Sequence, residues 1–300
     1  MRRGFADSTI HQYNSILRKF SYFAKEHLRD WNFPIPATVF ASYGLWLSDQ
    51  GFAPGTINSH LAGLGWWHKI KGFPDPSKEY LILRFKIGLA KSGPPSKQAA
   101  PVRFPLLKEI IGALPFFLSD FDVKLYRAAF LLAYFASLRV SEYAVAGNSS
   151  HTLNYDNVTF RGEEGGGLEL TLESYKASAR PARLLIPQEA SRDFCPVEAI
   201  RCYKKARPPG KGQFFVRGCG TPLSAFLVNK TLRSSLCVLG LSTDNFSAHS
   251  FRAGRTTDLV EMDQSDAVIR QSGRWKSNAF LKYVRFDMFS LPKGAPTLKD

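Results

Sequence analysis

A segment rich in proline, glycine and serine divides the chain: Ser92-Gly-Pro-Pro-Ser-Lys-Gln-Ala-Ala-Pro-Val-Arg103. This composition prevents helix formation and keeps the backbone stiff and extended. A length of 300 residues, 44% of them hydrophobic, allows a sizeable core and favours about two domains. We therefore predict one domain over residues 1–92, a linker over residues 93–104 and a second domain over residues 105–300.

Residues 1–92 have the pattern of a helical domain. The capping sequence Asp7-Ser8-Thr9 precedes apolar residues that recur at helical spacing from Ile10 to Phe23. Proline and glycine then separate three further helical segments, which we predict over residues 37–47, 56–70 and 78–91. Four helices separated in this way predict a compact bundle.

The longer part of the chain predicts helices and one small sheet. Residues 105–147 have helical composition, and residues 157–187 hold three short strands around the glycine-rich run 162–167. Helices resume near Pro196, Ser224 and His249. The glycine-rich run lacks the Lys-Ser/Thr of a phosphate-binding loop, so we interpret it as a hairpin turn. The predicted fold class is mainly α with a small antiparallel β-sheet.

The charge of the chain points to a polyanionic partner. The formal net charge is +15, and residues 1–100 alone hold 13 Lys and Arg against 6 Asp and Glu, a difference of +7. The longest apolar stretch, residues 128–138, is shorter than the ~20 residues that a membrane-spanning helix needs. The first residues lack the apolar region of a secretory signal. We expect a nuclear or cytoplasmic protein that is not secreted and has no membrane partner.

The sequence holds no pattern for a metal or a disulfide framework. Cys195, Cys202, Cys219 and Cys237 are separated by 7, 17 and 18 residues, which matches neither a zinc site nor a secreted disulfide scaffold. There is no His-Glu-x-x-His sequence and no Asp-rich loop. We expect four reduced thiols, no metal and no cofactor.

Residues 247–285 hold side chains suited to phosphoryl transfer. His249 and Arg252 stand three apart in a segment of helical composition, which places both on one face with Cβ atoms about 5–6 Å apart. Tyr283 ends an amphipathic run close to several cations. Phosphoryl transfer needs fixed positive charge, a group that moves a proton and a nucleophilic oxygen. Each residue taken singly is more often structural.

The order of these residues resembles a known signature. His249-x-x-Arg252, then Gly273-Arg274-Trp275, then Tyr283 is similar to the C-terminal pattern of the tyrosine recombinase (phage integrase) superfamily. The sequence of residues 273–285 looks most like that of the recombinases of DIRS/Ngaro-type and Crypton-type eukaryotic transposable elements. Trp275 stands where many members carry His, and its separation from Tyr283 is one residue shorter than in the phage enzymes.

Two further parts of the superfamily pattern lie upstream. Leu138-Arg139-Val-Ser-Glu142 matches the Leu-Arg-x-x-Glu that carries an earlier arginine, and Lys176 falls near the turn between two alternating strands, where the superfamily has a lysine. The resemblance covers about residues 105–290. It implies a two-domain, C-shaped clamp, in which a helical (SAM-like) core-binding domain precedes a tyrosine recombinase catalytic domain.

The resemblance also implies the catalytic roles. The residues concerned are Arg139, Lys176, His249, Arg252, Trp275 and Tyr283. The two arginines would bind the non-bridging phosphate oxygens, the lysine would protonate the leaving 5′ oxygen, and the histidine would move a proton to or from the tyrosine. The tryptophan would offer an N–H donor. The tyrosine would attack phosphorus and form a 3′-phosphotyrosyl enzyme without ATP.

Partners and function follow from the same resemblance. It implies double-stranded DNA as the partner and a homotetramer on DNA, with the apolar C-terminal tail (Phe286 to Leu291) docked on a neighbouring subunit or, alternatively, packed on its own domain. The implied function is site-specific DNA recombination or integration, of mobile-element origin. A catalytically silent, domesticated DNA-binding protein and a type IB topoisomerase-like relaxing enzyme stay open as alternatives.

Some charged residues stay open between two interpretations. Glu142 either orients Arg139 or forms an ordinary pair on the helix surface. A set of basic residues either contacts phosphates or forms a solvated face: Arg180, Arg183, Arg233, Arg255, Lys276 and Lys282.

Overall fold

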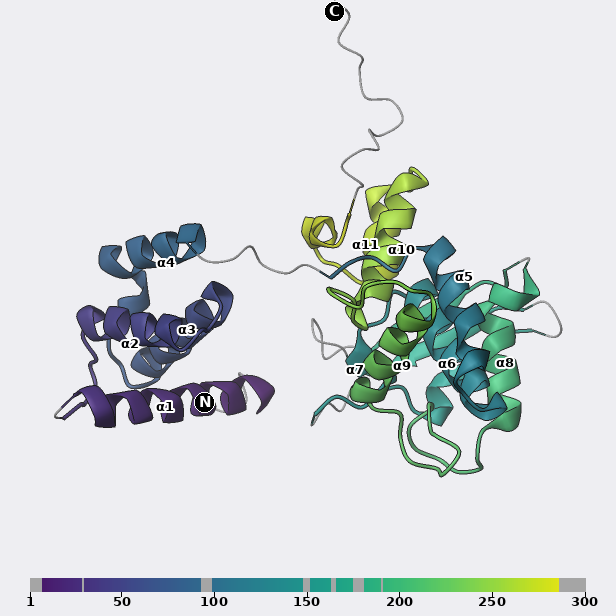
Figure 1. Cartoon of the computed structure of the whole chain (residues 1–300), viewed down its shortest axis with the longest axis horizontal. Helices are drawn as coiled ribbons and strands as arrows, with labels where there is room; N and C mark the ends of the chain where they lie inside the picture. The colour runs from purple at the N-terminus through teal and green to yellow at the C-terminus, as the bar shows by residue number, and fades with distance from the viewer. Residues whose placement is uncertain are drawn as a thin grey trace, which may run out of the picture. The chain divides into compact units, whose positions relative to one another are not determined.

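The computed structural model describes residues 7–28, 30–92, 99–147, 152–162, 166–174, 181–189 and 191–285. The chain divides into two compact units, Met1–Lys97 and Gln98–Asp300 (Figure 1). Each unit has a hydrophobic core of its own.

Unit 1, in its described residues, is a bundle of four α-helices. They are α1 (Asp7–His27), α2 (Ala37–Asp49), α3 (Pro54–Ile70) and α4 (Tyr80–Ser92), with the short 3-10 helix η2 (Pro76–Lys78) ahead of α4. Proline sets where two of them begin, because Pro36 precedes α2 and Pro54 opens α3, where its missing N–H costs no hydrogen bond. Phe20, Phe40 and Leu61 are fully buried at the centre of the bundle.

The described part of unit 2 is mostly helical. Its α-helices are α5 (Phe104–Ala113), α6 (Asp120–Phe135), α7 (Val140–Tyr143), α8 (Pro196–Ala206), α9 (Ala225–Val238), α10 (His249–Glu261) and α11 (Asp266–Gly273). Short 3-10 helices are η3 (Leu114–Phe116), η4 (Tyr155–Asn157), η5 (Arg192–Phe194) and η6 (Asn278–Lys282). Helix α6 is central: residues 128–134 are all buried, and the helix packs against α8 and α10, as expected where a helix is apolar on every side. Among the helices described in either unit, none has both the length and the apolar character to cross a membrane.

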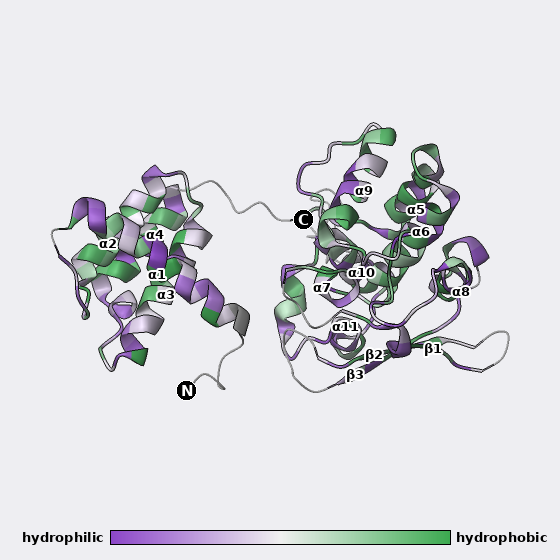
Figure 2. Cartoon of the chain, turned by 90° about the horizontal axis from the view of Figure 1, so that it is seen from below, coloured by the Kyte–Doolittle hydropathy of each residue, from purple (hydrophilic) through white to green (hydrophobic). Residues whose placement is uncertain are grey.

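A small sheet completes unit 2. Strands β1 (Val158–Phe160), β2 (Leu168–Leu172) and β3 (Ala182–Ile186) are antiparallel neighbours in the order β1-β2-β3, and they lie together in Figure 2. Leu170 pairs with Val158 on one side and with Leu184 on the other. Alternate leucines of β2 are buried, because successive side chains of a strand point to opposite faces.

The segment just before α5 is bound to unit 2. The N–H of Ala100 donates to the carbonyl of Asn245 at 2.8 Å, and the N–H of Val102 donates to that of Ser250 at 2.9 Å. Gly254 in α10 permits this approach, because a Cβ there would lie 1.8 Å from the carbonyl oxygen of Val102. Residues 99–103, which the sequence assigned to the linker, are therefore part of unit 2 in the structure.

Candidate active site

Helix α10, which carries two of the predicted site residues, is fixed by a buried carboxylate. Asp258, 4% exposed, accepts hydrogen bonds from Nε of Arg103 at 2.7 Å, from the N–H of Phe104 at 2.9 Å and from the hydroxyl of Tyr134. Charge-assisted bonds of this kind are stronger than neutral ones. They hold α10 against α6 and the start of α5.

The first turn of α10 presents His249 and Arg252. His249 is exposed. Arg252 is fully buried, and its two Nη atoms donate to the carbonyl oxygens of Ser137 and Gly273. These bonds join α10 to the turn between α6 and α7 and to the end of α11.

Arg139 immediately precedes α7, after a turn in which Ser137 has a φ of +45°. Glu142 accepts from the backbone N–H of Arg139 at 2.9 Å and from its Nη1 at 3.0 Å. A glutamate at the third helical position often bonds back to the residue ahead of the helix in this way. Because Glu142 is only 1% exposed, the pair is not an ordinary surface pair, and the carboxylate orients the arginine.

A third arginine reaches the same carboxylate. Arg274 directly follows α11 and donates from Nη2 to Oε2 of Glu142 at 2.6 Å and from Nη1 to the carbonyl of Ala136 at 3.2 Å. Its side chain is 5% exposed. The sequence contained Arg274 within Gly-Arg-Trp without assigning it a role. The available signal was a cation directly beside the predicted site residue Trp275.

Two guanidinium groups, those of Arg139 and Arg274, therefore share the carboxylate of Glu142, and a third, that of Arg252, lies near them. The pKa of Arg252 is lowered to about 9, first by burial and then by the charges of Arg139 and Arg274, while Tyr283 and Glu142 oppose the shift. An arginine pKa this low marks an excess of positive charge in a poorly solvated place. A phosphate diester is the kind of group that would relieve the excess.

Trp275 and Tyr283 lie against Arg252. The Cζ atom of Arg252 is 4.1 Å from the ring centroid of Trp275 and 5.3 Å from that of Tyr283, and the two rings are 5.4 Å apart. These are cation–π distances. An indole ring lies over this guanidinium and its two Nη atoms bond carbonyls, so the direct contact with phosphate predicted for Arg252 stays a prediction. Arg139, with 15% of its side chain exposed, is the more accessible arginine.

The segment that carries Tyr283 is held by a small apolar cluster. Phe280 in η6 is 2% exposed and packs with Leu259 of α10. Beyond the tyrosine, the N–H of Arg285 donates to Oγ1 of Thr257 at 3.1 Å. These contacts on both sides of Tyr283 hold its ring beside the arginines.

Of the six predicted site residues, the structure brings four together. The four are Arg139, Arg252, Trp275 and Tyr283. His249 lies one turn before Arg252 on the exposed side of α10. Lys176 lies outside the described residues, between the end of β2 and the start of β3, and so does the C-terminal tail, residues 286–300.

A cavity of about 690 Å³ adjoins the arginine cluster. Strand β3 lines one side, α10 and α11 line another, and Arg274 and Trp275 belong to its lining. Further positive charge comes from Arg183, Arg255, Arg270 and Lys276, against the single carboxylate of Glu189 among the lining residues. Some of the basic residues singled out in the sequence therefore gather beside the site.

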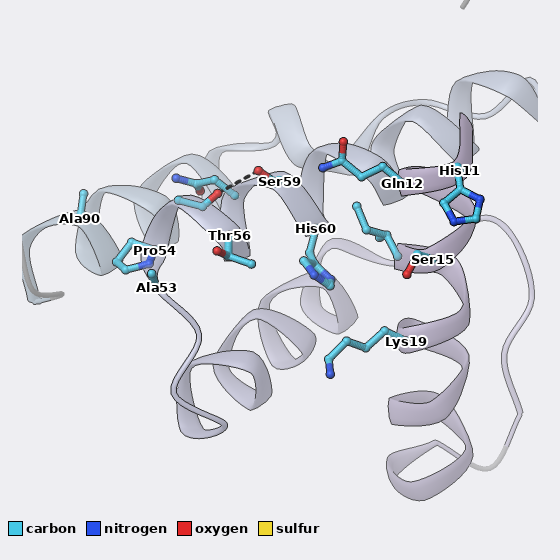
Figure 3. A pocket seen from close by; sticks show the side chains of 13 residues that line it. His11, Gln12, Ser15, Lys19, Ala53, Pro54, Thr56, Ser59, His60 and Ala90 are labelled. Atoms are coloured by element: carbon cyan, nitrogen blue, oxygen red, sulfur yellow. Dashed lines mark hydrogen bonds between the residues drawn. The ribbon is translucent and has the colours of Figure 1, made fainter. Parts of the chain in front are cut away.

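Unit 1 has a hollow of its own, about 1240 Å³ in volume, between α1 and the first half of α3 (Figure 3). Its polar lining carries donors and no carboxylate: His11, Gln12, Ser15, Lys19, Thr56, Asn58, Ser59 and His60. His60 bonds the hydroxyl of Tyr43 through Nδ1 at 2.8 Å. Burial and the nearby charge of Lys19 lower the pKa of His60, which favours the neutral imidazole.

The described residues hold no group of three or more His, Cys, Asp or Glu side chains placed to bind a metal ion. The four cysteines are free thiols, with Cys195 buried and the others exposed.

Comparison with known proteins finds solved structures with a similar fold. No protein-family model matches the chain, and no curated protein matches it. A lambda integrase dimer bound to a COC′ core site matches with a TM-score of 0.66 and 16% identity over 99% of this chain and 94% of that one. The XerH site-specific recombinase bound to a palindromic difH substrate matches with a TM-score of 0.67 and 16% identity over 91% and 75%.

A third solved structure agrees. The Tn1549 transposon integrase in complex with circular intermediate DNA matches with a TM-score of 0.63 and 14% identity over 95% of this chain and 92% of that one. At these identities the likeness concerns the fold. The predicted fold class, mainly α with a small antiparallel β-sheet, is confirmed, and it matches the fold of tyrosine recombinases and integrases.

Proposed function

We propose that the chain is a site-specific DNA recombinase or integrase that cleaves and rejoins DNA through a 3′-phosphotyrosyl intermediate on Tyr283. The observation that carries this proposal is the Tyr283 ring, 5.3 Å from Cζ of Arg252 in a cluster of three arginines, in a fold shared with integrases bound to DNA. The wording of residues 273–285 supports an origin in a mobile element of DIRS/Ngaro or Crypton type. We place its action in the nucleus or cytoplasm.

The reaction uses a small set of groups. The hydroxyl oxygen of Tyr283 attacks phosphorus and gives its proton to His249, while the P–O5′ bond breaks and the leaving oxygen takes a proton from Lys176. Arg139 and the charge of Arg252 stabilise the negative charge that builds up on the non-bridging oxygens. A 5′ hydroxyl from a second strand then attacks the phosphotyrosine and reverses these steps. Each step exchanges one phosphate ester for another, so no ATP is consumed.

Double-stranded DNA is the partner that we propose for both units. In unit 1 the hollow lined by imidazoles, hydroxyls, amides and Lys19 suits a phosphate backbone, because such donors make most contacts to phosphates. In unit 2 the basic cavity beside the arginine cluster suits the strand next to the reacting phosphate. The two units would close on the duplex as a C-shaped clamp, and the tail would link four copies on DNA.

Covalent trapping on nicked DNA tests the proposal. A nick placed just 3′ of the reacting phosphate lets the short 5′-hydroxyl fragment diffuse away, which leaves the protein attached to the 3′ phosphate. Element termini, or sequences selected by binding, supply the DNA. The wild type should form an adduct that survives denaturation, whereas Tyr283→Phe, which loses only the hydroxyl oxygen, should bind DNA equally well and form none.

Other outcomes point to the alternatives. Wild-type protein that binds DNA and never forms an adduct is a silent DNA-binding protein. Wild-type protein that relaxes supercoiled plasmid but joins no strands between molecules is a topoisomerase-like enzyme.

A further inference from the structure

Arg274 has a backbone conformation that few arginines adopt. Its φ is +56° and its ψ is +42° at the residue that follows α11, where glycine or asparagine is usual. Glycine is present one position earlier, but Gly273 serves another purpose, because a Cβ there would lie 1.8 Å from the ring of Trp275. The left-handed turn therefore falls on an arginine. Such strain persists only where surrounding contacts hold it, and it is frequent at functional sites.

The contacts of the Arg274 side chain stabilise this strained backbone conformation. Nη2 donates to Oε2 of Glu142 at 2.6 Å, across 132 residues of sequence, and Nη1 donates to the carbonyl of Ala136 at 3.2 Å. The side chains of Arg274 and Glu142 are 5% and 1% exposed. Removing one partner of an ion pair this buried strongly destabilises the fold, because the other charge is left buried without compensation.

The carboxylate of Glu142 is shared between two arginines. Oε1 accepts from Nη1 of Arg139 at 3.0 Å, and Oε2 accepts both the backbone N–H of Arg139 and Nη2 of Arg274. Without Arg274, Arg139 and Glu142 would form a closed pair with no net charge. With Arg274, the three groups keep a net charge of one positive unit, and Arg252 lies close enough for its pKa to respond to both arginines.

We propose that Arg274 is a positioning residue that sets the charge of the phosphate site. It engages Glu142, so that the guanidinium of Arg139 keeps positive charge available to an oxyanion. It acts through Glu142 and not by touching the reacting atoms. The proposal rests on the proposed function only for the identity of the oxyanion as a DNA phosphodiester.

Binding of orthovanadate to the full chain, measured by calorimetry, reports the positive charge of the phosphate site and requires no DNA cleavage. Arg274→Gln should weaken binding about tenfold or more, within the range of coupling between contacting residues. Arg274→Lys should restore part of the loss because it keeps the charge. Arg274→Gly relieves the strained turn while removing the side chain, so it should stay folded and lose the same binding.

A control variant and a double variant make the test specific. Arg201→Gln removes an arginine that pairs with Glu198 on α8 and does not line the cavity, and it should bind vanadate as the wild type does. In a Glu142→Gln background there is no carboxylate to compensate, so adding Arg274→Gln should change binding less than about twofold.

The outcomes separate this inference from the proposed function. Equal losses from Arg274→Gln with and without the carboxylate would overturn the inference, as would unchanged binding by Arg274→Gln or no binding by the wild type. Vanadate binding that depends on Arg274 as described, in a protein that never forms a DNA adduct, would uphold the inference and refute the proposed function. A DNA adduct formed at the wild-type rate by Arg274→Gln would refute the inference and support the proposed function.

Discussion

Arg252 shows most clearly what the arginine cluster is built for. It is fully buried, its pKa is lowered to about 9, and its Nε has no hydrogen-bond partner within the described part of the chain. Burying a charge is unfavourable unless an opposite charge compensates it. The nearby carboxylate of Glu142 is bound to other arginines. An anion bound beside the cluster, as proposed for the DNA phosphodiester, would supply further compensation.

Replacing Trp275 by alanine should expose the Arg252 guanidinium. Phenylglyoxal labels accessible guanidine groups in their neutral form, and a pKa of about 9 increases the neutral fraction near that pH compared with an ordinary arginine. Peptide mass mapping should find Arg252 unlabelled in the wild type and labelled in Trp275→Ala. Arg270, 40% exposed, serves as the internal control in both. Protection of Arg252 in the variant would mean that the indole ring is not its cover.

For single residues, the sequence predicts which side chains share a helix face better than it predicts the groups that surround each side chain. The spacing of His249 and Arg252 predicts neighbouring positions on a helix, because residues three apart are neighbours on any helix, but it does not predict that His249 is exposed and Arg252 fully buried. The burial of Arg252 depends on backbone carbonyls of Ser137 and Gly273, which no side-chain pattern encodes. The role of Arg274 likewise depends on a left-handed turn that a sequence containing Gly-Arg-Trp does not specify.

The element that positions Tyr283, the proposed nucleophile, is η6. It is short, and the small cluster around Phe280 and the bond from Arg285 to Thr257 keep its end against α10. Displacing a reacting group by about 1 Å can cost about 10²-fold in rate. The apolar cluster is therefore important to the proposed reaction although it touches no phosphate.

Phe280→Ala should loosen this element and leave the rest of unit 2 folded. We expect covalent adduct formation to slow by about 10²-fold, while DNA affinity stays within about twofold, because the arginines proposed to bind phosphate are unchanged. Leu281→Ala is the matched control, since Leu281 is the next residue of η6 and is 59% exposed. Equal effects of the two variants would remove the anchoring role from Phe280.

The helices and strands were largely predictable from the sequence, but the residues at which segments begin and end were not. Helical spacing and proline positions predicted the four helices of unit 1, and alternation predicted the strands now seen as β1, β2 and β3. The linker was predicted too long at its C-terminal end, because its composition cannot show that Gly254 admits the backbone of Val102. Close approaches of this kind depend on the tertiary structure.

At the scale of the whole molecule, charge is the dominant property. The net charge is +15, and the polar side chains that line the hollow of unit 1 and the cavity of unit 2 are cations or neutral groups, apart from Glu189. Such a distribution favours binding to a phosphate backbone by release of counterions.

The affinity for duplex DNA should therefore fall steeply with salt. A log–log plot should have a slope of about −0.9 per phosphate neutralised, and six to ten contacts would reduce the affinity by about 10³- to 10⁵-fold between 50 and 200 mM salt. Fluorescence anisotropy with a labelled duplex measures this. A slope near zero would contradict binding by both units along the backbone.

Deleting residues 286–300 tests the proposed tetramer. The tail holds Phe286, Met288, Phe289 and Leu291, which would leave an exposed apolar patch unless they pack against protein. If they dock on a neighbouring copy, the deletion should lower the mass of the DNA-bound complex and leave binding by a single copy intact. Mass photometry on DNA carrying two sites measures both. Unchanged assembly would indicate that the tail packs on its own domain.

Identifying the residue that carries the DNA is the most direct test of the central claim. Lys282 and Arg285 flank the tyrosine, so trypsin should release it in the peptide Tyr283-Val284-Arg285. After trapping on nicked DNA and digestion with nuclease and trypsin, tandem mass spectrometry should find a nucleotide joined through phosphate to Tyr283. A nucleotide found instead on another tyrosine, such as Tyr175 or Tyr203, would contradict the account.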